Sequence, residues 1–175
     1  VGCDDGAGFE MSLFKKPVDV LKEYGLSPSD ITDVIITHSH HDHIEAISSY
    51  EKAIIHIQED EYRKGKHYIS SLTAVETFAE EFNLCSGIVM KRIGGHDVGS
   101  CIVICETYGK TYVLCGDECY VKKCLTEKIP TGSSHNRSIS QSFVAEYSKE
   151  KYIPLLFHDP EILPGKLGHE IIKKA

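Results

Sequence analysis

Four side chains that can bind a metal ion fall within six consecutive residues of this sequence: His38, His40, Asp42 and His43. They directly follow the apolar run Val34–Ile36, which is typical of a buried strand. Imidazole and carboxylate groups are ligands that suit zinc, manganese or iron. Because a strand that ends in this loop would hold the four side chains close together, the spacing H-x-H-x-D-H predicts a metal site rather than a histidine-rich surface loop.

Single residues with the same ligand chemistry follow three later strand-like runs. His96 comes after an apolar run and two glycines, Asp117 follows Gly116 at the end of another run, and His158 ends the last. A strand-end aspartate is by itself more often a turn or cap residue. A site built along one sheet edge nevertheless requires ligands at several strand ends, so these three residues are candidate ligands.

The bulk composition excludes some functions. At 175 residues we expect one domain, residues 1–175, and the net charge of −7 argues against nucleic acid or an anionic membrane as a partner. We therefore expect a small-molecule substrate. No run approaches the roughly eighteen apolar residues of a membrane helix. The seven cysteines lack C-x-x-C spacing, so we expect reduced, structural thiols and a cytoplasmic protein.

Helix and strand patterns alternate along most of the chain. Apolar spacing and turn residues predict helices over 17–24, 44–50, 58–64, 72–82 and 138–149, the last with a Ser138/Gln141 capping box. Strand patterns lie at 31–37, 53–57, 87–93, 101–107, 111–115 and 152–157, where Pro154 indicates an edge position. This alternation predicts an α/β architecture with helices packed on a sheet.

The ordered set of ligands resembles the metallo-β-lactamase superfamily over nearly the whole chain. The H-x-H-x-D-H motif is matched by His38 to His43, and the histidine in a glycine-containing loop by His96. The bridging aspartate is matched by Asp117 and the final histidine by His158. The resemblance implies the four-layer αββα fold of that superfamily.

The resemblance also implies a ligand set and a reaction. One metal would be held by His38, His40 and His96, and the second by Asp42, His43 and His158, with Asp117 as the bridge. Two divalent ions, zinc by default and manganese or iron as alternatives, would stabilise a bridging hydroxide. That hydroxide would cleave an ester, lactone or thioester, with Asp42 orienting it and later carrying a proton.

Four details favour a hydrolase of the glyoxalase II-like or lactonase-like branches. His40 stands where flavodiiron oxygen reductases typically have Glu, and Asp117 stands where true β-lactamases with a cysteine ligand have Cys. Tyr120 lies at the offset where N-acyl homoserine lactonases use a tyrosine to contact the substrate carbonyl, although a tyrosine packed on the core explains it equally well. The segment 154–161 is similar to the lactonase ending.

The resemblance implies several strands before the turn at Cys3–Gly6, close to which this sequence starts. We therefore expect an N-terminally incomplete first sheet, either because the sequence is a fragment or because a partner chain supplies the strands. We expect association into a homo-oligomer through the open edge, or copurification with the N-terminal sequence. Three alternative functions stay open: a phosphodiesterase or nuclease of the same superfamily, a metal-binding domain without catalysis, and a redox diiron protein.

Overall fold

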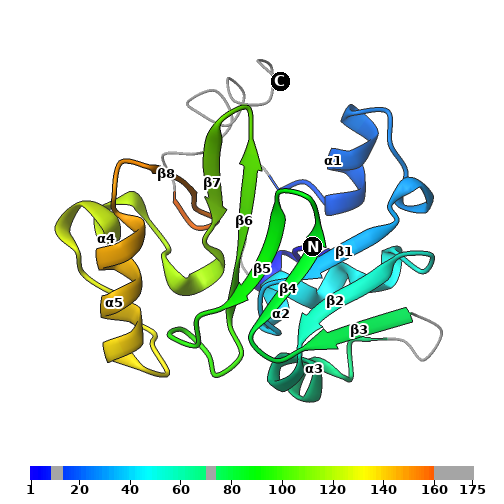
Figure 1. The fold of residues 1–175 in the computed structure, drawn as a ribbon. Helices are drawn as coiled ribbons and strands as arrows, with labels where there is room; N and C mark the ends of the chain where they lie inside the picture. Colours follow the sequence, from blue (N-terminus) through cyan, green and yellow to red (C-terminus); the bar gives the residue numbers. More distant parts are fainter. Residues whose placement is uncertain (9–13, 70–73, 160–175) are drawn as a thin grey trace. The chain divides into compact units, whose positions relative to one another are not determined.

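The computed structural model describes residues 1–8, 14–69 and 74–159, which fold as two compact units (Figure 1). Unit one comprises residues 1–80 and unit two residues 81–175. Each unit has its own β-sheet and its own apolar core, so the chain is a mixed α/β protein with two sheets and helices. The two units are described separately below.

Unit one is built on a three-stranded parallel sheet in the order β1-β2-β3. Its strands are β1 (Asp33–Ile36), β2 (Ile54–Gln58) and β3 (Ala74–Phe78). Its helices are α1 (Pro17–Glu23), α2 (His41–Ile44) and α3 (Glu59–Gly65), with 3-10 turns at Gly6–Gly8, Pro28–Asp30 and Glu45–Ser49. Ile36 of β1 is buried in the apolar core of this unit together with Ile55 and Ile57 of β2.

Unit two is built on a five-stranded sheet in the order β4-β5-β6-β7-β8. Its strands are β4 (Glu81–Cys85), β5 (Ile88–Arg92), β6 (Cys101–Thr107), β7 (Lys110–Leu114) and β8 (Tyr152–Leu155). Strands β4 to β7 are antiparallel neighbours, whereas β8 pairs with β7 in parallel. A 3-10 turn at Gly116–Glu118 precedes α4 (Lys122–Glu127) and α5 (Arg137–Tyr147), and Phe143 of α5 packs in the core with Ile102 and Val113.

Most of the predicted elements are confirmed with small shifts at their ends. The strand predicted over 152–157 is β8, and Pro154 lies at the sheet edge as expected. The helix predicted over 72–82 is wrong: residues 70–73 lie outside the described part, and the rest forms β3 and β4. Pairing with β2 and β5 overrode the local helix pattern.

Two further details differ from expectation. Asn136, rather than a Ser138/Gln141 box, caps α5, and its Oδ1 accepts from the backbone N–H groups of Ser138 and Ile139. The helix expected over 44–50 is a 3-10 helix at Glu45–Ser49, and the short helix α2 precedes it from His41, inside the ligand motif. Among the described residues, no helix is both long and apolar enough to cross a membrane.

Candidate metal centre

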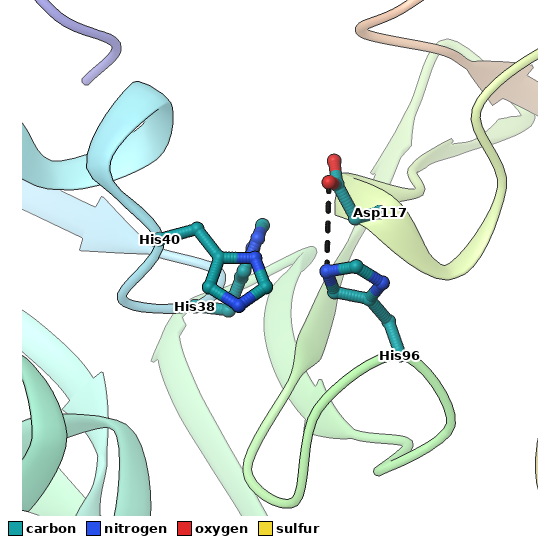
Figure 2. Close-up of side chains that lie close together, drawn as sticks. All are labelled: His38, His40, His96 and Asp117. Atoms are coloured by element: carbon teal, nitrogen blue, oxygen red, sulfur yellow. Dashed lines mark ion pairs between the residues drawn. The ribbon is translucent and has the colours of Figure 1, made fainter. Parts of the chain in front are cut away.

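In unit one the candidate ligands lie in one short segment, residues 37–43, which we call the ligand loop. Strand β1 ends at Ile36 and helix α2 begins at His41, so the loop has little freedom. The ring of His38 lies 4.7 Å from that of His40 and 4.2 Å from that of His43, measured between centroids. Figure 2 shows His38 and His40 on this loop after β1.

The remaining contacts of the ligand loop are those of a metal-binding segment. His38 is buried, and its Nδ1 lies 3.3 Å from the Thr37 hydroxyl. Asp42 Oδ2 lies 3.3 Å from Nε2 of the buried His43. Three imidazoles and a carboxylate thus share a small space, which is a donor set that fits a divalent transition metal.

In unit two the ligands come from three strand ends: His96 follows β5, Asp117 follows β7 and His158 follows β8. The parallel register of β7 and β8 pairs Leu114 with Leu155, and Asp117 and His158 each lie three residues beyond that pair. Parallel strands end at the same edge of a sheet, so these two side chains meet there. We call these three residues the strand-end ligands.

Asp117 contacts both histidines of this group, and each contact uses a different oxygen. Asp117 Oδ1 lies 3.1 Å from His158 Nε2, and Oδ2 lies 3.6 Å from His96 Nε2 (dashed in Figure 2). Asp117 and His96 are buried, whereas His158 is exposed. A buried carboxylate next to two imidazoles is a donor set that could bind a divalent metal ion.

The orientation of His96 indicates which nitrogen can bind a metal. Its Nδ1 faces the Ser133 carbonyl oxygen at 3.1 Å, and an acceptor at that position requires the ring proton on Nδ1. In the neutral form of this ring, the Nε2 lone pair would face the carboxylate of Asp117 at 3.6 Å. Two electron-rich atoms in that arrangement are satisfied by a shared cation, so the residues present fit a metal ion.

Tyr120 lies beside the strand-end ligands. Its hydroxyl is 3.5 Å from His96 Nδ1, and its ring centroid is 5.8 Å from that of His96 and 5.3 Å from that of His158. The half-buried phenol thus lies against two candidate ligands instead of within the core. Its position suits a hydrogen-bond donor to a bound substrate.

Comparison with known proteins identifies the family. The model of the metallo-beta-lactamase superfamily matches residues 1–155. The chain belongs to this superfamily. The matched residues include the ligand loop, His96 and Asp117, whereas His158 lies beyond the matched range. A search of curated proteins gave no match.

Solved structures of the superfamily share the fold at low identity. A quorum-quenching N-acyl homoserine lactone lactonase is 22% identical with a TM-score of 0.72, and the match covers 84% of this chain and 66% of the lactonase. A probable metal-dependent hydrolase from Staphylococcus aureus is 24% identical with a TM-score of 0.73, covering 86% and 62%. AidC, a dizinc quorum-quenching lactonase, is 16% identical with a TM-score of 0.66, covering 85% and 63%. The chain therefore spans slightly less than two thirds of the length of these neighbours.

The cysteines near the superfamily ligands are not candidates for thiolate chemistry. All seven are free thiols, and Cys115 and Cys119 are buried beside Asp117. Burial raises the pKa of Cys115 to about 12 and raises that of Cys119 further. Both remain protonated near neutral pH, which agrees with the prediction of structural thiols.

Unit one holds a further cluster of groups with metal-ligand chemistry, which the sequence did not predict as a site. Asp5, His41 and Glu45 form a cluster in unit one whose ligand-type atoms lie within 4.8 Å of one another. His41 Nε2 lies 2.8 Å from Asp5 Oδ2 and its Nδ1 lies 3.0 Å from the Tyr68 hydroxyl, so hydrogen bonds account for both nitrogens. Two hydrogen bonds lower the pKa of Asp5. The one from the Ala7 N–H has the larger effect, and the one from His41 the smaller.

Two glutamates were also missed, Glu61 in α3 and Glu118 beside Asp117, and both are buried. Burial raises the pKa of Glu118, while hydrogen bonds from Ser100 and from the backbone of His96 and Gly95 act in the opposite direction. Nothing in the local sequence marks either glutamate, because acidic residues in a helix or after a strand are usually exposed.

Proposed function

We propose that this chain is a metal-dependent hydrolase that cleaves an ester, lactone or thioester bond in a small molecule. In this proposal the ligand loop and the strand-end ligands together hold two divalent ions, with zinc as the metal. Support comes from membership of the superfamily and from the fold shared with N-acyl homoserine lactonases. One of those neighbours is described as a dizinc enzyme in complex with a product.

The observation that carries the proposal is the double contact of Asp117. A carboxylate that places one oxygen near each of two imidazoles suits the bridge between two cations. We assign His38, His40 and His96 to one ion and Asp42, His43 and His158 to the other. This division gives each ion imidazole ligands and a share of the bridging carboxylate, as the donor preferences of zinc require.

Each further residue has a role that follows from its chemistry. When bound, the two ions supply a nucleophilic water at neutral pH and polarise the substrate carbonyl. Asp42 accepts a proton from the attacking water and delivers it to the leaving oxygen or sulfur. The Tyr120 hydroxyl donates a hydrogen bond to the negative charge that develops on the carbonyl oxygen, which a preorganised donor stabilises by a few kcal/mol.

The test combines metal content with a panel of substrates. The purified chain, loaded with zinc, is expected to hold two ions and to hydrolyse an N-acyl homoserine lactone or a thioester. His96→Ala should lower metal content and hydrolysis together. His67→Ala is the matched control, because His67 is exposed and its ring packs on Tyr68 at 4.1 Å.

Other outcomes would redirect the assignment. Turnover of bis-(p-nitrophenyl) phosphate without any lactone or thioester turnover would make the chain a phosphodiesterase. Two bound ions without hydrolysis of any ester would leave a metal-binding domain. Unchanged metal content and rate in His96→Ala would remove His96 from the ligand set.

A further inference from the structure

Glu61 and Glu118 are the buried glutamates among the described residues, one in each unit. Burying a carboxylate is unfavourable unless hydrogen-bond donors replace its lost water. The identity of those donors therefore indicates what each glutamate does. In both cases the donors belong to segments that carry candidate metal ligands.

In unit two, a single oxygen of Glu118 holds the segment that presents His96. Glu118 Oε1 accepts from the backbone N–H of Gly95 at 3.1 Å and from that of His96 at 3.2 Å. The Ser100 hydroxyl donates to the same oxygen. Two of the three donors are the N–H groups of consecutive peptide bonds, Gly94–Gly95 and Gly95–His96, so Glu118 fixes the backbone from which the His96 side chain projects.

The backbone at residue 95 fits only a glycine in this arrangement. A Cβ added to Gly95 would clash with Glu118 Oε2 and would lie 2.6 Å from the Ser140 hydroxyl. The carboxylate thus reaches the backbone because no side chain separates them. Tight approach and direct hydrogen bonding leave the His96 segment little room to move.

In unit one, Glu61 holds the ligand loop in a similar way. Glu61 Oε2 accepts from the backbone N–H of Ser39 at 2.9 Å and from the Ser39 hydroxyl at 2.7 Å. Ser39 lies between His38 and His40, so a constraint on its peptide acts on both ligands. Gly65, at the end of α3, again permits the close approach, because a Cβ there would lie 2.8 Å from Ser39 Cβ.

We propose that Glu61 and Glu118 are positioning residues that hold the two metal-binding segments in place by hydrogen bonds from their backbone. This inference rests on the proposed function for the ligand assignment. Neither glutamate is a ligand in this proposal. Each orients the peptide that carries the ligands, as residues behind a metal site do when they fix its geometry.

Two substitutions of Glu118 separate the effect of side-chain length from the effect of charge. Glu118→Gln keeps the length of the side chain and an acceptor oxygen but removes the charge, whereas Glu118→Asp keeps the charge and is shorter by one methylene. Positioning predicts that Glu118→Asp weakens zinc binding about 10–100-fold, and that Glu118→Gln stays within a few-fold of wild type. In unit one, Glu61→Asp should likewise weaken zinc binding more than Glu61→Gln.

Zinc affinity is measured by competition with a chelator, on samples shown to be folded. Phe143→Leu in unit two and Ile55→Val in unit one are controls, because both residues are core side chains. They should lower the free energy of unfolding and leave zinc affinity unchanged. A second readout is the hydrogen exchange of the Gly95 and His96 amides, which should be faster in Glu118→Asp than in Glu118→Gln.

The outcomes distinguish this inference from the proposed function. Wild-type affinity in both Asp variants would overturn the positioning role even if hydrolysis occurs. Weaker zinc binding in the Gln variants than in the Asp variants would also overturn the positioning role, because the charge of the side chain would then matter more than its length. Zinc binding with the predicted order but no ester hydrolysis would support positioning and contradict the hydrolase assignment. If wild type binds no zinc, the hydrolase assignment fails and the amide exchange decides the positioning role.

Discussion

The two units present candidate ligands in different ways. Unit one supplies four from consecutive or nearly consecutive positions in one loop after β1. Unit two supplies three from the ends of β5, β7 and β8, between residues 96 and 158. The first arrangement depends on the local geometry of one loop, whereas the second depends on the register of a whole sheet.

This difference determines how each group responds to change. A substitution in the ligand loop removes one donor and leaves the loop's anchors at both ends, β1 and α2. A change in unit two can alter the pairing of Leu114 with Leu155, which places Asp117 and His158 at the same edge. We therefore expect the strand-end ligands to be the more interdependent group.

The largest expected effect separates a bridging ligand from a terminal one. Asp117→Ala should weaken binding of both ions, because it removes a donor from each. His38→Ala should reduce binding of one ion. Loss of a residue that only supports a ligand typically lowers metal affinity about 10–100-fold, so loss of the ligand itself should lower it at least as much. Elemental analysis after dialysis gives the number of ions that each variant retains, and competition with a chelator gives the change in affinity. Two retained ions in Asp117→Ala would show that Asp117 is not a bridge.

A smaller effect is expected from a residue that contacts substrate instead of metal. Tyr120→Phe keeps the ring beside His96 and His158 but removes the hydroxyl. We expect kcat to fall by up to about 10²–10³-fold, the cost of losing one oxyanion donor. Zinc content should not change.

The control for this substitution is Tyr108→Phe, since Tyr108 is 87% exposed at the β6–β7 turn. It should leave kcat at the wild-type value. An equal loss of zinc and kcat in Tyr120→Phe would instead assign Tyr120 a structural role behind His96.

The contrast between the units also explains what the sequence could predict. The ligand loop is a local pattern, so its residue types and spacing are visible without a structure. His96, Asp117 and His158 could be proposed because each follows an apolar run, but their mutual contacts depend on strand order and register. The helix predicted at 72–82 failed for the same reason, since β3 and β4 are fixed by pairing with β2 and β5.

The two positioning glutamates lie beyond what sequence patterns reveal. Glu61 is one of several acidic residues at the start of α3, and its half-buried neighbour Glu59 has the same residue type. Only packing decides which of them turns toward Ser39. Glycine at positions 65 and 95 indicates that another part of the chain packs closely against the backbone there. The sequence alone does not identify that part of the chain.

The smallest expected effect concerns the sheets themselves. The sheet of unit one contains buried His56, whose Nε2 lies 2.8 Å from Asp33 Oδ1 and whose Nδ1 lies 3.3 Å from Glu76 Oε2. Two hydrogen bonds lower the pKa of Asp33 below its ordinary value of 3.8. The one from Thr32 has the larger effect, and the one from His56 the smaller. In unit two, by contrast, the central strands bury Ile102 and Val113.

Asp33 should therefore make unit one slightly sensitive to acid. A carboxyl whose pKa is lowered on folding adds stability above its ordinary pKa, and this stability disappears as the pH falls through the lowered value. Asp33→Asn should lower the free energy of unfolding at pH 7 by less than about 1 kcal/mol, since the side chain is partly exposed and the pair is screened by solvent. The difference from wild type should shrink toward pH 3 in urea titrations. Glu106→Gln, the same charge change at an exposed position of β6, is the control, and a difference that persists unchanged at pH 3 would show that Asp33 acts through packing and not through its charge.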